Sequence, residues 1–226
     1  MGFQSKSGVA AALAWILASC AGEAVREGPG EVDAEVLERR RRDEALEVLA
    51  ALERTFYTHW GAVEGTAECA RLGEGHLPAL RRIADANREH ALGALRVLER
   101  RAPAEKFSVD ARAILYVSAL ERERNFSRWG VIGPRGFVPA VYGQELLRLG
   151  PDAAPYLRRL LGDRRRAPFF GDAEGERANR LQGDRVCDYA WIFLATVFDR
   201  PLSYAADPRD RDPQILALDR WLDGRK

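Results

Sequence analysis

Cysteine has the most varied chemistry of the residue types in this chain, and the sequence contains three: Cys20, Cys69 and Cys187. A thiol can act as a nucleophile, form a disulfide or carry a lipid. Cys20 differs from the other two in what precedes it. Residues 1–7 are polar, residues 8–17 are almost wholly apolar, and two small residues follow directly before the cysteine. This three-part order is the layout of a secretory signal.

The junction Leu17-Ala18-Ser19-Cys20 resembles the lipobox of bacterial lipoproteins. That resemblance implies that residues 1–19 are a signal peptide and that Cys20 is acylated on its sulfur and becomes the new N-terminus. It also implies a protein held at an envelope membrane, which we expect to be the outer rather than the inner membrane.

Two other interpretations of this segment stay open. Its apolar run is about a dozen residues long, short of the roughly 20 that a permanent transmembrane helix needs. Ordinary signal cleavage after Ala21 would give a secreted or periplasmic protein, because Ser19 and Ala21 are both small. A cytoplasmic protein is the third possibility, since Lys6 is the only cation before the apolar run.

Acylation of Cys20 would leave Cys69 and Cys187 as the remaining thiols. In an oxidising envelope compartment two cysteines can form one disulfide, so this pair is a disulfide candidate. The alternative is two separately buried thiols, which the apolar surroundings of Cys187 favour.

Other groups of potentially functional residues do not have the spacing of known binding or catalytic motifs. Three glycines lack the spacing of a phosphate-binding loop, and no Gly-x-Ser-x-Gly elbow occurs. No two histidines stand three or four residues apart, and three aspartates depart from the calcium-loop pattern. The residues considered are Gly130, Gly133, Gly136, His59, His76, His90, Asp207, Asp210 and Asp212. We therefore expect no metal, no cofactor and no evident small-molecule substrate.

Charge argues against nucleic acid as a partner. The chain has 35 basic and 34 acidic residues, and removal of residues 1–19 takes away one cation, Lys6. The mature chain is then formally neutral, whereas nucleic-acid binding needs a basic face.

Composition and apolar spacing predict an all-α fold. Alanine, leucine, arginine and glutamate dominate, and these residues favour helix. We expect a flexible tether over residues 20–31 and one helical domain over 32–226. Helices are predicted over 32–60, 77–83, 89–101, 108–120, 138–149, 185–199 and 213–222, with no strand longer than three or four residues.

Several details of these helices can be predicted as well. Ser108 and Asp212 are expected N-caps, with Pro213 at the first helical position after Asp212. Residues 125–136 are expected to form a loop broken by glycine and proline. The helix over 185–199 is expected at the centre of the core, because residues 189–198 are apolar on nearly every face.

Two segments of the chain repeat each other. Residues 71–83 align without gaps on residues 148–160 at an offset of 77, sharing Arg, Leu, Gly, Pro, Leu, Arg and Arg. In each, Leu-Gly ends one helix and a proline stands in the first turns of the next. Each is followed by a second apolar helix, and recurring helix pairs are typical of an α-solenoid.

The Leu-Gly-x-x-Ala-x-Pro-x-Leu pattern of residues 149–157 resembles the first helix of a HEAT-like (armadillo-type) repeat. Residues 186–197, with Val186, Ala190 and Leu194, resemble the second helix. The resemblance covers about half of the mature chain and implies a short solenoid of antiparallel helix pairs that serves as a scaffold. Residues 108–150 fit the pattern poorly, and residues 163–183 form a polar insert within the last pair.

The start of this insert is the candidate partner surface. It combines cations with aromatic residues, types that are enriched at binding hot spots. The alternative is that the aromatic side chains anchor the loop to the core while the cations are solvated. The candidate residues are Arg164, Arg165, Arg166, Phe169 and Phe170.

These observations favour a non-catalytic protein-interaction module anchored to an envelope membrane through Cys20, with an unidentified protein partner. An envelope hydrolase with an active site of dispersed acids and histidines is the alternative. A concave pocket with converging titratable groups would favour the hydrolase.

Overall fold

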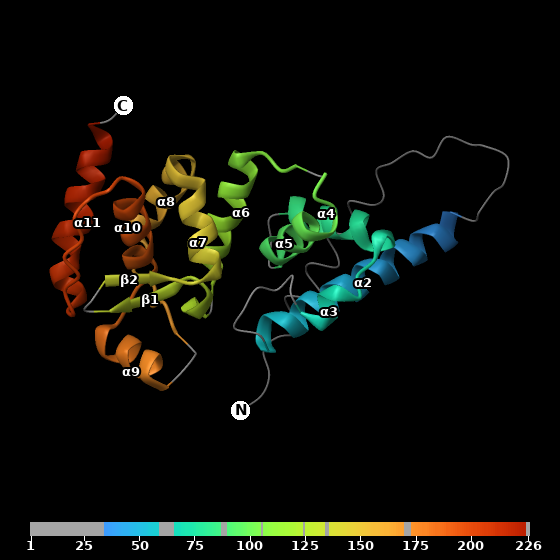
Figure 1. The fold of residues 1–226 in the computed structure, drawn as a ribbon, viewed down its shortest axis with the longest axis horizontal. Coiled ribbons are helices and arrows are strands. Elements are labelled where there is room, and N and C mark those ends of the chain that lie inside the picture. The colour runs from blue at the N-terminus through green and yellow to red at the C-terminus, as the bar shows by residue number, and fades with distance from the viewer. Residues whose placement is uncertain are drawn as a thin grey trace. The chain divides into compact units, whose positions relative to one another are not determined.

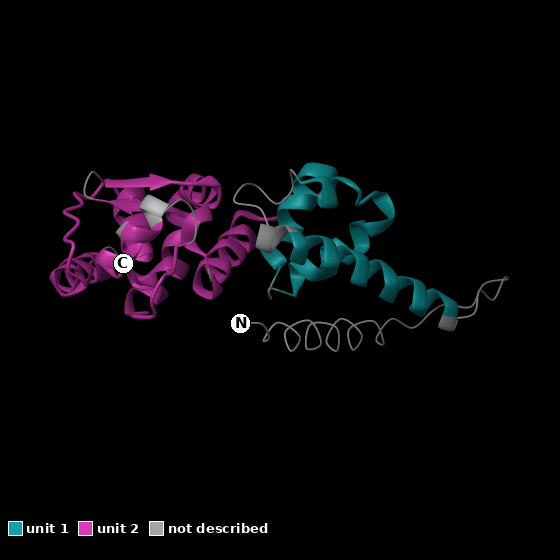
Figure 2. Ribbon diagram, turned by 90° about the horizontal axis from the view of Figure 1, so that it is seen from below, with its two compact units in different colours: residues 1–106 teal, residues 107–226 magenta. Residues whose placement is uncertain are grey.

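The computed structural model describes residues 34–58, 66–86, 90–104, 106–123, 125–133, 136–169 and 173–224, and the described chain is mainly helical. Residues 1–33, with the predicted signal, Cys20 and the tether, lie outside the described residues. The chain divides into two compact units, residues 1–106 and 107–226, which Figure 2 colours separately. Among the described helices, none combines the length and apolar character needed to span a membrane.

The described part of the first unit is helical, and Figure 1 labels its helices. Its elements are α2 (Ala34–Thr58), α3 (Ala67–Ala70), η2 (Glu74–His76), α4 (Leu77–Asp85) and α5 (Ala91–Arg101).

Helix α4 packs against both α2 and α5, and the core of the first unit is formed by buried residues of these helices. Ala45, Leu49 and Leu52 of α2 are buried, and their spacing of three and four residues puts them on one side of the helix. Leu80 of α4 and Leu95 of α5 are fully buried as well.

The second unit holds the remaining helices and the only sheet of the described residues. Its elements are α6 (Val109–Arg122), η3 (Phe126–Arg128), β1 (Gly130–Gly133), β2 (Gly136–Pro139), α7 (Val141–Leu149), η4 (Gly150–Ala153), α8 (Ala154–Arg158), η5 (Arg159–Gly162), α9 (Ala173–Gln182), α10 (Val186–Val197) and α11 (Pro208–Asp223).

Helix α10 lies at the centre of the second unit's core, as predicted. Every residue from Val186 to Ala195 is buried, and α7, α8, η5 and α11 pack around the helix. Ser108 caps α6 as expected, because its hydroxyl accepts a hydrogen bond from the backbone N–H of Ala111 at 3.1 Å.

The loop predicted over 125–136 was wrong in part, because its second half is one strand of a hairpin. β1 pairs antiparallel with β2, from Gly130 opposite Pro139 to Gly133 opposite Gly136. Trp129, directly before β1, is fully buried and packs edge-on against Tyr142 and Phe193. The burial of this indole fixes a segment whose glycines and proline indicate only a turn.

Two helix boundaries also differ from prediction. The helix expected from residue 138 begins at Val141, because Val138 and Pro139 belong to β2. Helix α11 begins at Pro208 with Asp207 as its N-cap, five residues before the predicted start. Asp212 therefore lies inside the helix, where its carboxylate binds arginines. The polar insert is not a plain loop either, because it contains α9.

Candidate binding site

Helices α10 and α11 run parallel, and the connection between them returns along their length. Near the helix starts Asp188 contacts Arg211, and near the helix ends Phe198 contacts Trp221. Residues 198–207 form the connection, which we call the crossover. Figure 1 shows it leaving the end of α10 and descending to the start of α11. A HEAT-like repeat would pair its helices antiparallel, so α10 and α11 are not such a pair.

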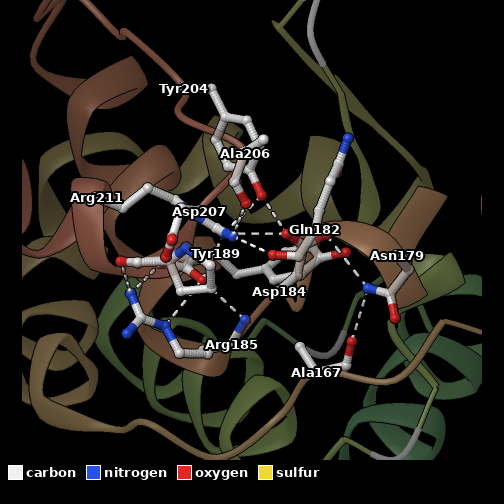
Figure 3. Close-up of polar contacts among 12 residues, drawn as sticks. Ala167, Asn179, Gln182, Asp184, Arg185, Tyr189, Tyr204, Ala206, Asp207 and Arg211 are labelled. Carbon is white, nitrogen blue, oxygen red and sulfur yellow. Dashed lines mark hydrogen bonds and ion pairs between the residues drawn. The ribbon is translucent and has the colours of Figure 1, made fainter.

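A buried charged cluster holds the lower end of the crossover, next to the start of α11, in place (Figure 3). Arg211 of α11 is fully buried, and its Nη1 donates to Asp184 at 3.0 Å and to Asp188 at 2.7 Å. The same atom lies 2.6 Å from the hydroxyl of Tyr204, which belongs to the crossover. The other terminal nitrogen donates to two backbone carbonyl oxygens. We call Asp184, Asp188, Tyr204 and Arg211 the Arg211 cluster.

Burial and charge change the acidity of this cluster. Burial raises the pKa of the Asp184 carboxyl, although Tyr204 and Arg211 both stabilise its charged form. Burial also raises the pKa of Tyr204, as do the charge and hydrogen bond of Asp184. The tyrosine therefore stays a neutral hydrogen-bond donor.

A second set of charges connects the N-terminal end of α10 to α11. Arg185 donates to Asp188 at 3.0 Å and to Asp212 at 2.7 Å. Burial disfavours the charge on Arg185, but these two carboxylates more than offset burial and raise its pKa. Asp212 also pairs with Arg164, and its pKa is lowered because these arginines outweigh its partial burial.

The predicted partner surface lies beside this end of α10. Arg164 binds Asp212, Arg165 binds Asp163, and Arg166 donates to the carbonyl oxygen of Arg180 at 3.2 Å. The three side chains are exposed, but all are engaged in contacts within the unit. Phe169 is buried, in agreement with the alternative in which an aromatic side chain anchors the loop, and Phe170 lies outside the described residues.

Both disulfide candidates are free buried thiols, one in each unit. Cys187 accepts a hydrogen bond from Arg164 at 3.3 Å, while burial and the nearby Asp188 charge raise the pKa of its thiol. A buried thiol with a raised pKa is a poor nucleophile. The structure thus agrees with the alternative of two separate core cysteines.

A pocket of about 210 Å³ opens between α10, α11 and the upper end of the crossover, which follows the end of α10. Its walls are mainly apolar, with Gln214 as a neutral polar group and Arg200 as its charged one. The guanidinium of Arg200 lies 4.7 Å from the ring centroid of Trp221. The main lining residues are Trp191, Ala195, Arg200, Gln214, Leu218 and Trp221.

The crossover gives this pocket a fixed wall. The backbone N–H of Arg200 donates to the carbonyl oxygen of Ala195 at 2.7 Å, which closes the turn after α10. Tyr204 stacks on Trp191 with ring centroids 6.5 Å apart and planes 20° from parallel. Since the hydroxyl of Tyr204 is held by the Arg211 cluster, that cluster positions the wall of the pocket without lining it.

No pattern in the sequence predicts this pocket. Trp221 lies within the last predicted helix, 213–222, and Trp191 within the apolar residues 189–198, and neither position by itself indicates a pocket. One signal was present: Asp188 is a charged residue inside an otherwise apolar helix, and such a residue needs a buried partner. Nothing in the sequence shows that Arg211 is that partner.

The chain matches no protein family, no curated protein and no solved structure to which it was compared. Within the described residues, no three side chains of histidine, cysteine, aspartate or glutamate come together as metal ligands would.

Proposed function

We propose that this chain is a lipid-anchored protein-interaction module of a bacterial envelope membrane. Cys20 carries the anchor, residues 20–31 form the tether, and the helical units present the binding surface. The proposal has two parts, the anchor and the binding surface, and each has its own support.

One observation carries the anchor: the Leu17-Ala18-Ser19-Cys20 box, directly after an apolar run too short to span a bilayer. A single acyl chain gives only marginal membrane binding, whereas two or more hold a protein firmly. The neutral mature chain is consistent with attachment through lipid rather than through attraction to anionic head groups.

Supporting the solenoid part of the proposal is the local order of the two repeated segments. In each, a 3₁₀ turn leads into a helix with proline near its start, and these helices begin at Leu77 and Ala154, 77 residues apart. Helix α4 packs on α5, and α8 packs on α10. We propose that these two helix pairs are HEAT-like repeats and that α11 is an addition to the second.

The binding part is supported by the pocket beside α11. Known small-molecule sites have volumes of about 300–1,000 Å³, so a cavity of about 210 Å³ suits one protein side chain better than a cofactor. Tryptophan and arginine are also the residue types most enriched at protein–protein hot spots. The hydrolase remains a hypothesis; the buried acids Asp184 and Asp188 bind Arg211 and do not line this pocket.

Fractionation of cells that produce the Cys20→Ser variant tests the anchor. The variant should move from the membrane to the soluble fraction, because it has no thiol to acylate at the box. Ser19→Ala is the matched control, since it keeps a small residue beside an intact cysteine, and it should remain with membranes. Membrane retention of Cys20→Ser would contradict the proposal.

A further inference from the structure

We propose that the pocket between α10, α11 and the crossover binds the C-terminal residue of a partner protein. An apolar side chain would fill the pocket and the α-carboxylate would bind Arg200. This inference rests on the proposed interaction function and names the partner's chemistry.

Charge is the first argument for a carboxylate. Arg200 is the one charged side chain among the residues that line the pocket. Within the described residues it forms no ion pair with a carboxylate, and its recorded side-chain contact is with the Trp221 ring. Stacking uses the face of a guanidinium and leaves the N–H donors at its edge, which suit two carboxylate oxygens. The pocket therefore favours an anion at its rim.

Size and shape are the second argument, and they favour a single residue. The walls of this open-mouthed pocket include indole and aliphatic side chains, with Trp191 and Leu218 buried in them. These apolar groups would exclude water from an apolar side chain of a partner. A volume of about 210 Å³ matches one side chain better than it matches a long acyl chain or a nucleotide.

The position of Arg200 at the cavity indicates which carboxylate of the partner it would bind. Arg200 lines the same small cavity as the apolar groups, so the bound anion and apolar group must lie close together. In an extended peptide, the neighbouring side chain points to the opposite face, and the next one on the same face is about 6.6 Å away. A C-terminal residue instead carries its carboxylate and its side chain on one Cα atom.

The crossover keeps these groups in place before any partner binds. Its upper end is fixed by the Arg200 N–H bond to Ala195, and its lower end by Tyr204 in the Arg211 cluster. A preformed site loses less freedom on binding, so a short peptide is a fair probe of it.

Calorimetric titration of the purified full chain tests the proposal. The chain carries Cys20→Ser so that it remains in solution. The main probe is N-acetyl-Gly-Gly-Phe with a free carboxylate, compared with its C-terminal amide. A third peptide, the amide of N-acetyl-Glu-Gly-Phe, offers a side-chain carboxylate instead, and a fourth ends in glycine. The free acid should bind about tenfold more tightly than either amide, a difference of about 1.4 kcal/mol, and the glycine peptide should bind more weakly.

Two variants assign the binding to the pocket. Arg200→Gln should remove the preference for the acid, while Arg209→Gln, an exposed cation of α11 outside the pocket, should keep it. Ala217→Leu should block the cavity, whereas Ser203→Leu adds the same bulk to the crossover away from the lining. Thermal melting confirms that each variant is folded.

Several results would overturn the inference. They are no binding by any peptide, equal affinity for acid and amide, stronger binding of the side-chain carboxylate, and binding that is unchanged in both pocket variants. None of these bears on membrane attachment, which the Cys20→Ser fractionation measures separately. If an envelope partner is captured equally by wild-type protein and by Ala217→Leu, the interaction function stands and the pocket is not its site.

Discussion

Replacement of Arg211 by methionine should destabilise the second unit strongly, because it leaves Asp184 buried without a cation and leaves Asp188 with Arg185 alone. The Arg211 side chain is fully buried and donates to Asp184, Asp188 and two backbone carbonyl oxygens. Removal of one partner from a buried ion pair costs about 3–5 kcal/mol in the free energy of unfolding. Arg209→Met, two residues earlier on the same helix and exposed, should change it by less than about 0.5 kcal/mol.

The loss of stability caused by Arg211→Met should also depend on pH, and the direction of this dependence follows from the pKa of Asp184. Its pKa in the folded protein is raised by burial, above the unfolded value of about 3.9. Between those two pKa values the folded state binds more protons, so the contribution of Asp184 to stability falls as the pH rises. Loss of the Arg211 charge raises the folded-state pKa of Asp184 further. The pH range over which Asp184 reduces stability therefore becomes wider. The cost of Arg211→Met should therefore be smaller at about pH 5 than at about pH 7.

Chemical denaturation followed by circular dichroism measures both quantities. Asp184→Asn added to Arg211→Met should recover part of the lost stability, because it removes one buried charge that has lost its cation. Three results would refute the reasoning. They are a cost below about 1 kcal/mol at neutral pH, a cost that does not change with pH, and a double variant no more stable than Arg211→Met alone.

Three further substitutions probe the packing of the second unit, each by denaturant melting against the wild type. Phe193→Ala should cost about 3–5 kcal/mol, because its ring is fully buried in the centre of the core; a cost below about 1 kcal/mol would place it at the periphery. Gly143→Ala should also destabilise, since a Cβ at this position would lie 2.0 Å from the carbonyl oxygen of Trp129; unchanged stability would mean that α7 can shift freely. Arg164→Ser should cost less than about 1 kcal/mol, because its pair with Asp212 is solvent-exposed; a larger loss would make this arginine structural.

The helices of this protein could largely be predicted from apolar spacing and capping residues. Ser108 is an N-cap, and the apolar run after Arg185 is the buried centre of the second unit. Both follow from local rules, because a serine before an amphipathic segment and a helix without a polar face each have few alternatives.

Features that depend on contacts between distant residues could not be predicted from the sequence. The hairpin after Trp129 exists because that indole is buried against α7 and α10, and the glycines around it are equally typical of a loop. Asp207 and Asp212 are both plausible caps before a proline. The choice between them is made by Arg185 and Arg164, which bind Asp212 from another part of the chain.

The candidate site was missed for the same reason. Its walls come from α10, α11 and the crossover, and the path of the crossover depends on Tyr204 reaching a buried arginine. Neither the direction of a ten-residue connection nor the partner of Asp188 follows from local pattern.

Intact mass spectrometry of the mature protein from envelope membranes tests the central claim most directly. The proposal predicts a chain that begins at Cys20 and carries the additional mass of acyl groups, which disappears in Cys20→Ser. A mature chain that begins at Ala21 or later, with no acyl groups, would contradict it.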